Sequence, residues 1–151
     1  MDKVRIVRRS RIDFQKAIDE LKGSRNTSDC GAITCFIGIV RSLGKDGSRV
    51  QQLIYEAYEK EALKVLRKIR DEILEKNRGV KDLLIYHVID KLKPGDETLF
   101  IAAIGKHRQD SLNAVSQAIE EIKSRPPIWK KELTEKGAYW TTEFKEAQKG
   151  G

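Results

Sequence analysis

Between Glu59 and Asn77 the apolar residues recur at the spacing of an α-helix, and Lys, Glu and Arg occupy the opposite face. The apolar positions are Ala62, Leu63, Val65, Leu66, Ile69, Ile73 and Leu74. Gly79 follows as the stop signal of this helix. A helix with one apolar stripe needs another layer to cover that stripe, so the rest of the chain has to supply one.

We predict that the covering layer is a sheet, because the chain carries several apolar, β-branched runs bounded by loops. Val50, Leu53 and Tyr55 are the expected core residues of the run at 49–58. The predicted strands are Val4–Val7 as an edge strand, 31–40 (GAITCFIGIV) as a central strand, 49–58, 80–89, 98–105, and a last short strand in AYWTTEF at 138–144.

Two further helices are predicted. Asp13 can cap a short helix over FQKAIDELK, which Gly23 ends. The second helix, over SLNAVSQAIEEIK, should end near Lys123 or Ser124, because Pro126 disfavours helical geometry at the residue before it. Its apolar stripe is Leu112, Val115, Ile119 and Ile122.

The order of elements is strand, helix, two strands, helix, two strands, helix and a last strand. Helices packed on a mixed, largely antiparallel sheet belong to the α+β class. With 151 residues the chain can bury one substantial core. We expect a single domain over residues 1–151.

The chain is basic, since 30 Lys and Arg against 23 Asp and Glu give a net charge of +7. This excess favours an anionic partner, either a nucleic acid, a phosphorylated small molecule or an acidic protein surface. No apolar run approaches the roughly 20 residues that span a bilayer, and the N-terminal region lacks the apolar segment of a secretory signal. We expect a cytoplasmic protein that does not contact membranes.

The two cysteines, Cys30 and Cys35, lie in CGAITCF, which has the character of a strand. Their odd spacing would direct them to opposite faces of the sheet, which disfavours a disulfide or a shared metal. No further cysteine could complete a zinc site. We expect two buried structural thiols, no metal and no resident cofactor.

The segment GKHRQDSLNA joins the end of a buried strand to a helix that begins at Asp110 or Ser111. The N–H groups at such a helix start bind anions. Arg108 could clamp a phosphate, and His107 could donate or carry a proton. The alternative is a capped helix with solvated charges, which includes Lys106.

Two other polar residues lie in or beside apolar strands. Arg41 follows the strand at 31–40 and precedes a glycine-bearing loop, a position where scaffolds present functional groups. A surface arginine explains Arg41 equally well. We interpret His87 as a packed histidine without a functional role.

The segment KSRPPIWKKE at 123–132 places lysines on both sides of a stiff Pro-Pro-Ile-Trp unit. The dipole at a helix end accounts for Lys123, but not for Lys130 and Lys131. Amines clustered with one another and with arginines would lower the pKa of at least one lysine. Such an amine can act as an acid, base or nucleophile near neutral pH.

Four segments, in this order, resemble the large, catalytic subunit of molybdopterin synthase: GAITCFIGIVR, LIYEAY, KPGDETLFIAAIGKHR and IKSRPPIWKKE. The resemblance covers about residues 31–140 and implies the α/β-hammerhead fold with a smaller antiparallel β portion. It implies a sulfurtransferase that converts cyclic pyranopterin monophosphate into the molybdopterin dithiolene. The sulfur would come from the C-terminal Gly-Gly thiocarboxylate of a small ubiquitin-like subunit. Two large subunits would form a homodimer with one small subunit at each end, a heterotetramer.

The same resemblance implies the site residues. Lys123 is expected to be the principal acid/base and Lys130 the second catalytic residue. Arg41, His107 and Arg108 are expected to hold the phosphate and the pterin, with Arg41 reaching across the dimer interface. The full set of substrate-binding positions is Ile39, Val40, Arg41, His107, Arg108, Lys123, Lys130, Lys131 and Glu132.

Two other function classes stay open at this point. A basic nucleic-acid-binding module would interleave aromatic residues with Arg and Lys on an exposed sheet. Aromatic residues make up only 7% of this chain and are scattered. A noncatalytic scaffold would bind a ubiquitin-like partner without chemistry, and it would tolerate Lys123→Ala and Lys130→Ala.

Overall fold

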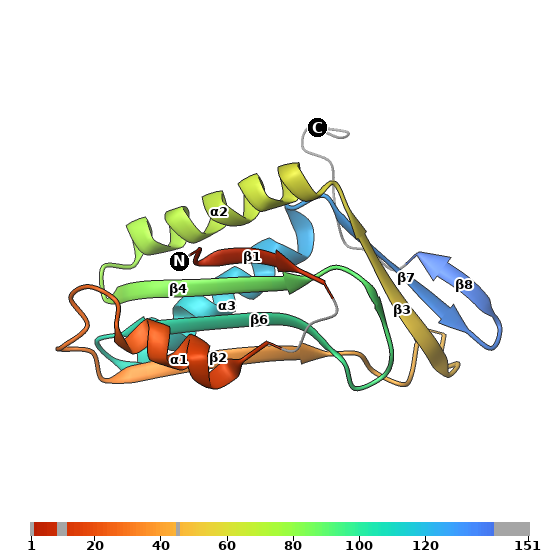
Figure 1. The fold of residues 1–151 in the computed structure, drawn as a ribbon, viewed down its shortest axis with the longest axis horizontal. Helices are drawn as coiled ribbons and strands as arrows, with labels where there is room; N and C mark the ends of the chain where they lie inside the picture. Colours follow the sequence, from red (N-terminus) through yellow and green to blue (C-terminus); the bar gives the residue numbers. More distant parts are fainter. Residues whose placement is uncertain (1, 9–11, 45, 141–151) are drawn as a thin grey trace.

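The computed structural model describes residues 2–8, 12–44 and 46–140. Figure 1 shows helices packed on a sheet, with further strands extending from one end. The elements are β1 (Val4–Val7), α1 (Phe14–Lys22), β2 (Ala32–Ile39), β3 (Val50–Ala57), α2 (Glu59–Lys76), β4 (Val80–Val88), β5 (Lys91–Leu92), β6 (Glu97–Gly105), α3 (Arg108–Ser124), β7 (Ile128–Thr134) and β8 (Gly137–Trp140). Within these described ranges, no helix is long and apolar enough to cross a membrane.

The first sheet has the strand order β1-β4-β6-β2 and is mixed. β1 runs parallel to β4, whereas β6 is antiparallel to both β4 and β2. α1 covers one face of the sheet, and α2 and α3 cover the other (Figure 1). The predicted α+β class is confirmed.

Each face of this sheet has its own core, because successive side chains of a strand point to opposite faces. Leu83 and Ile85 of β4 pack with α2 and α3, whereas Leu84 packs on the other face with Leu21 of α1. The stripe predicted for the long helix is confirmed: the buried residues of α2 are Ala62, Leu66, Ile69 and Ile73.

The second sheet has the order β5-β3-β7-β8 and is antiparallel throughout. It confirms the smaller antiparallel portion of the expected hammerhead fold. Its long pair, β3 and β7, places Tyr55 opposite Lys130 and Leu53 opposite Glu132. β8 confirms the start of the predicted last strand, whose remaining residues, 141–144, lie outside the described part of the chain.

β2 lies at the edge of the first sheet, so the prediction of a central strand at 31–40 is wrong. One face of β2 carries exposed apolar side chains, including Ile37 at 42% and Ile39 at 57% exposure. We call Cys35, Ile37, Ile39 and the following Leu43 the β2 strip. An apolar run is typical of a strand covered on both faces, but here the described chain leaves one face of the run uncovered.

The expected burial of both thiols is also wrong. Cys35 belongs to the exposed β2 strip, and Cys30 is only partly buried because it precedes β2 rather than lying within it. Although the Cys35 side chain is exposed, partial desolvation by its neighbours raises the pKa of its thiol above the ordinary value. Desolvation, and then the charge of Asp29, likewise raise the pKa of Cys30. Both thiols are therefore held in the protonated form at neutral pH.

Capping residues set the helix ends. The Asp13 carboxylate accepts a hydrogen bond from the backbone N–H of Lys16 at 3.0 Å, and α1 ends at Gly23 as predicted. α3 begins earlier than predicted, because the Asp110 carboxylate accepts the backbone N–H of His107 at 3.1 Å and so acts inside the first turn.

α3 ends at Ser124, within the predicted range, but the prediction that Leu112 belongs to its buried apolar stripe is wrong. Leu112 is 48% exposed. The helix turns a face of smaller residues to the sheet instead, and this face permits close packing. Its buried residues are Ser111, Ala114, Val115, Ala118 and Ile122.

Candidate active site

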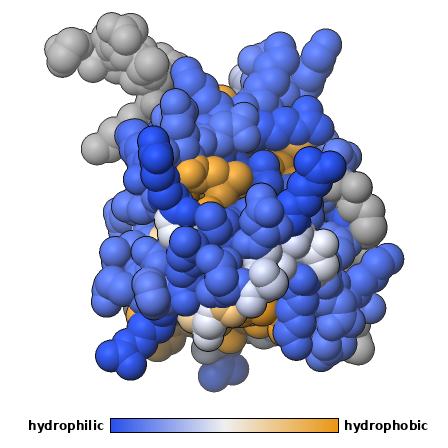
Figure 2. All heavy atoms as spheres, turned by 90° about the vertical axis from the view of Figure 1, so that its left-hand side faces the viewer, coloured by the Kyte–Doolittle hydropathy of each residue, from blue (hydrophilic) through white to orange (hydrophobic). Residues whose placement is uncertain are grey.

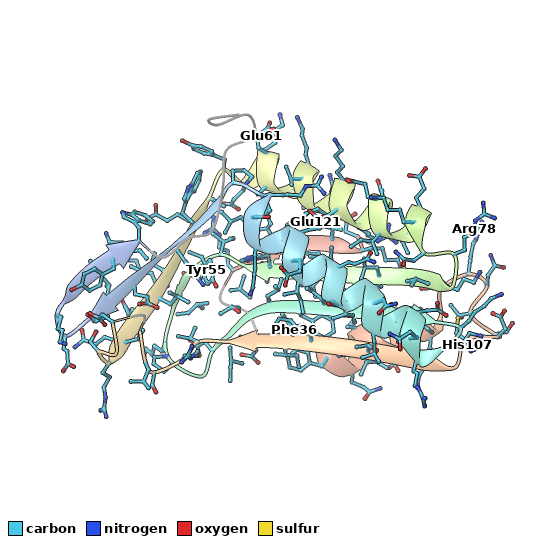
Figure 3. The ribbon with its side chains drawn as sticks, turned by 180° about the vertical axis from the view of Figure 1, so that it is seen from behind. Phe36, Tyr55, Glu61, Arg78, His107 and Glu121 are labelled. Atoms are coloured by element: carbon cyan, nitrogen blue, oxygen red, sulfur yellow. The ribbon has the colours of Figure 1, made fainter. Side chains whose placement is uncertain are left out.

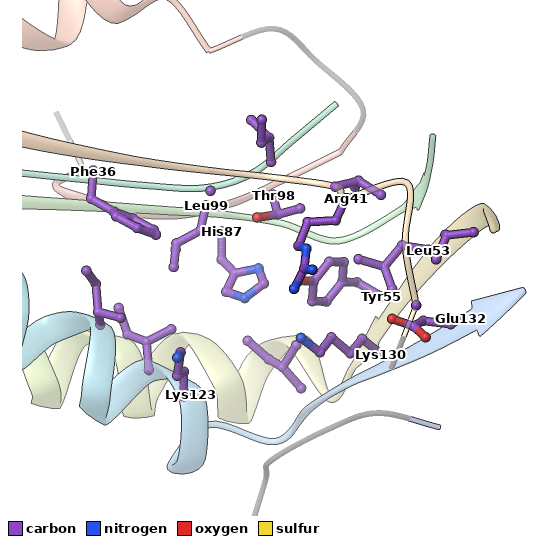
Figure 4. Close-up of a pocket in the computed structure, with 18 of the residues that line it drawn as sticks. Phe36, Arg41, Leu53, Tyr55, His87, Thr98, Leu99, Lys123, Lys130 and Glu132 are labelled. Atoms are coloured by element: carbon purple, nitrogen blue, oxygen red, sulfur yellow. The ribbon is translucent and has the colours of Figure 1, made fainter. Parts of the chain in front are cut away.

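A pocket of about 330 Å³ opens where the two sheets meet the C-terminal end of α3 (Figure 4). Its walls include the apolar side chains of Phe36, Leu53, Leu99, Ile119, Ile122 and Ile128. Its polar lining consists of Arg41, Tyr55, His87, Thr98, Lys123, Lys130 and Glu132. The pocket therefore offers both a surface for a flat apolar ring and several charged groups.

Three cations from separate parts of the chain line this pocket: Arg41 after β2, Lys123 in the last turn of α3, and Lys130 on β7. We call these three residues the cationic rim. Ile39 and Val40, also expected in the site, line the same pocket. The sequence stretches that carry these residues are far apart, and the fold brings them together.

An ionic clamp fixes the end of α3, and with it Lys123. The guanidinium of Arg125 donates to the Glu72 carboxylate of α2 at 3.0 and 3.2 Å, and to Glu121 at 3.3 Å. The hydrogen bond from Arg125 lowers the pKa of Glu72, and the same bond raises the pKa of Arg125. Pro126, which is fully buried, follows this clamp and ends the helix.

β7 selects which of its residues reach the pocket. Ile128, Lys130 and Glu132 line it, because alternate side chains of a strand share a face. Trp129 and Lys131 lie between them and point to the opposite face.

On that opposite face the side chains contact aromatic rings. Trp129 meets Tyr58 edge-on with ring centroids 5.0 Å apart, and the Lys131 ammonium lies 5.4 Å from the centre of the Trp140 ring. The structure thus brings Lys130 and Glu132 to the pocket but not Lys131. The resemblance assigned Lys130, Lys131 and Glu132 to one site, whereas the alternation of side chains along β7 places Lys131 on the opposite face.

His107 and Arg108 lie at the N-terminal end of α3, and Lys123 lies at its other end. At 1.5 Å per residue, about 22 Å separate Arg108 from Lys123. Figure 3 shows His107 and Arg78 at one end of the molecule and Tyr55 at the other. Figure 2 looks onto the His107 end, which is mainly hydrophilic. One chain alone therefore does not bring His107 and Arg108 to the pocket.

His87 lines the pocket, although its place inside an apolar strand predicted a packed histidine without a functional role. The side chain is buried, its Nδ1 lies 3.0 Å from the Val88 carbonyl oxygen, and its ring meets Tyr55 edge-on at 5.2 Å. Burial, together with the charge of Lys130, lowers the pKa of His87 to about 4. The signal in the sequence was a polar residue inside an apolar run, which does not distinguish a core position from a pocket wall.

Tyr55 and Thr98 join His87 on the inner side of the pocket, and we call these three residues the neutral floor. Burial raises the pKa of Tyr55 to about 12, against a hydrogen bond with Thr98 that lowers it. The phenol and the imidazole are therefore both uncharged at neutral pH. In the described part of the chain, no three His, Cys, Asp or Glu side chains are grouped so as to hold a metal ion.

This arrangement can bind a ligand that has an anionic part and a ring. The cationic rim would pair with phosphate or carboxylate oxygens. The apolar walls and the neutral floor would hold a ring that carries few charges. Amines beside an anion can stabilise negative charge that develops during a reaction.

The sequence model of the MoaE protein family matches residues 7–125. The molybdopterin synthase catalytic subunit of Pyrococcus abyssi (strain GE5 / Orsay) is 37% identical over 123 residues, which are 82% of this chain and 82% of that protein. The subunit of the same name from Drosophila persimilis is 43% identical over 106 residues, or 70% of this chain, which spans only 29% of that longer protein. The crystal structure of molybdopterin synthase from Staphylococcus aureus matches with a TM-score of 0.81 and 37% identity, covering 93% of this chain and 98% of that one.

Proposed function

This chain belongs to the MoaE protein family, and from that premise we propose that it is the catalytic subunit of a molybdopterin synthase. As a sulfurtransferase, it acts on cyclic pyranopterin monophosphate and forms the dithiolene of molybdopterin. The sulfur comes from the C-terminal thiocarboxylate of a small ubiquitin-like partner. The names of the relatives support this function over a nucleic-acid-binding module or a noncatalytic scaffold.

The convergence of the cationic rim on one pocket is the observation that carries this proposal. Both proposed reactants are anions, one a phosphate and the other a thiocarboxylate. Lys123 acts as the principal acid/base at the thiocarboxylate, and Lys130 assists proton transfer or stabilises negative charge. Arg41 pairs with the substrate's anionic group.

We further propose that a second copy of the chain completes the site with its His107 and Arg108. β2 begins at Ala32, which pairs with Gly105 just before α3, and it ends at Ile39 beside the pocket. Its seven steps of about 3.3 Å span about 23 Å, which matches the length of α3 between the two half-sites.

Two copies that pack antiparallel along β2 about a two-fold axis place the start of α3 from one copy at the pocket of the other. The β2 strip supplies the apolar surface that such a contact buries. Arg41 lines the pocket of its own chain. In this arrangement His107 and Arg108, rather than the expected Arg41, are therefore the residues that reach across the interface. With one small partner on each copy, the assembly is a heterotetramer. The cytoplasmic location expected from the sequence stays a prediction.

The function is tested by reconstitution. The chain is mixed with a thiocarboxylated small partner and cyclic pyranopterin monophosphate, and the dithiolene product is measured. Wild type should form product, and Lys123→Ala should lose most of the rate. Absence of product from wild type, with a thiocarboxylate shown to be intact, contradicts the proposal.

The shared site has a separate test in a mixture of two inactive chains, Lys123→Ala and Arg108→Ala. A mixed dimer contains one site with both native residues if Lys123 and Arg108 come from different copies. An equal mixture that exchanges freely should therefore recover about a quarter of the wild-type rate. No recovery, in a mixture shown to form mixed dimers, would mean that the two residues do not act across an interface.

A further inference from the structure

The neutral floor of the pocket holds a hydrogen-bond acceptor that the roles above do not use. We propose that His87 is a substrate-binding residue whose Nε2 accepts a hydrogen bond from an N–H or O–H group of a heterocyclic ring. This inference rests on the proposed function and assigns His87 to the ring of the ligand rather than to its phosphate.

The contacts of His87 define which nitrogen can accept. A carbonyl oxygen only accepts hydrogen bonds, so the Nδ1 that lies 3.0 Å from the Val88 carbonyl carries the proton. In the neutral ring, Nε2 then holds the lone pair. Figure 4 shows the imidazole projecting from β4 into the pocket between Phe36 and Tyr55.

The groups around the imidazole explain why a neutral acceptor matters. The charged and titratable side chains that line the pocket with it are Arg41, Tyr55, Lys123, Lys130 and Glu132. The cationic rim can only donate hydrogen bonds, and the Tyr55 hydroxyl is engaged with Thr98. The Glu132 carboxylate can accept, but it lies beside Gly44 rather than on the neutral floor. A ring with its own N–H donors therefore needs an acceptor on the inner side, and His87 provides one.

The acceptor persists over the working pH range. The pKa of His87, lowered to about 4 by burial and by the charge of Lys130, keeps the ring neutral. An exposed histidine with a pKa of about 6.5 would instead become a donor on both nitrogens below neutral pH.

The walls beside His87 indicate the shape of the ligand. Phe36, Leu99 and Ile128 offer apolar surface, on which a flat ring can lie. The rim then meets the anionic end of the same molecule. The fitting chemical class is a flat heterocycle that carries N–H or O–H donors and a phosphate.

Three variants of His87 separate hydrogen bonding from structure. His87→Gln keeps an acceptor near the position of Nε2, His87→Asn reaches only the position of Nδ1, and His87→Phe fills the space without an acceptor. The dissociation constant for cyclic pyranopterin monophosphate should rise roughly 10- to 100-fold in the Phe and Asn variants. In the Gln variant it should stay within about threefold of wild type. A pterin without phosphate, as a second probe, should show the same order.

Nitrogen NMR of the imidazole detects the proposed hydrogen bond to Nε2 directly and does not depend on product formation. The chain has two histidines, so the Gln variant assigns the His87 signals by their loss. The Nε2 resonance of His87 should move when cyclic pyranopterin monophosphate is added and should show no titration between about pH 5.5 and 8.

The inference is overturned if Nε2 does not move at saturating ligand, or if the Asn variant binds like wild type while the Gln variant does not. The second pattern would mean that the bond to Val88, a structural contact, is what matters. Failure of the proposed function is a different result: wild type binds the precursor but forms no dithiolene with the thiocarboxylated partner.

Discussion

Lys130 and Lys131 are neighbours with the same charge on one strand, and the structure predicts opposite consequences when each is neutralised. Lys130 lines the pocket, whereas Lys131 lies over Trp140 on the other face of β7. Methionine is the matched replacement, because it keeps most of the apolar stem and removes the ammonium.

For Lys130→Met, the loss of one preorganised donor at a developing charge should lower product formation about 100- to 1,000-fold, or about 3–4 kcal/mol in transition-state free energy. For Lys131→Met, the lost contact is an exposed cation–π pair worth about 0.5–1 kcal/mol of stability. The rate of product formation by Lys131→Met should stay within about threefold of wild type, since the contact with the Trp140 ring lies outside the pocket.

The assay is dithiolene formation with the thiocarboxylated partner, accompanied by urea unfolding of each variant. Lys130→Arg adds a control, because arginine keeps the charge but does not release its proton. Recovery by arginine would indicate charge stabilisation, and no recovery would indicate proton transfer. Equal rate losses in the two methionine variants, or a larger loss at Lys131, would refute the assignment of the two faces of β7.

Three further predictions concern the rest of the molecule. Burial tends to raise the pKa of Asp82, but hydrogen bonds from Ser24, Lys3 and Arg70 lower it overall. Asp82→Asn should therefore reduce the free energy of unfolding by about 1–3 kcal/mol at pH 7. Because the folded pKa is depressed, this difference should be complete above about pH 4 and should shrink as the pH falls below it, which urea titrations at pH 7 and pH 3 can check. Ile37→Glu places a charge in the β2 strip and should shift sedimentation toward monomer with loss of activity; an unchanged dimer would remove the proposed interface. Gly79→Ala would bring a methyl group within 2.4 to 2.6 Å of the Asp110 carboxylate, so it should cost about 1 kcal/mol or more by disturbing the cap of α3, as thermal unfolding can measure.

The helices and most strands were predictable from local patterns. The stripe of α2, the Asp13 cap and the proline stop after α3 depend on backbone geometry within a few residues, and such signals are complete in the sequence. The resemblance likewise predicted that Arg41, Lys123 and Lys130 belong to one site, because each lies inside a contiguous recognisable segment, and all three line one pocket.

The composition of the site was decided by contacts between distant segments. The apolar run at 31–40 has the same pattern whether a further strand covers it or not, so only the sheet order shows that β2 is an edge. A histidine in the run LIYHVI can face either a core or a pocket. The environment of His87 is decided by the packing of β4 against β3 and α3, which together line the pocket.

Within a single chain, some residues that the resemblance assigned to one site lie apart from the pocket. Lys131 leaves the pocket because a strand alternates its faces, and Arg108 stands about 22 Å from Lys123 because a straight helix holds its two ends apart. Local sequence thus specifies which backbone states form, since those states depend on near neighbours. Which side chains share a cavity depends on how the finished elements pack, and that geometry is a property of the whole fold.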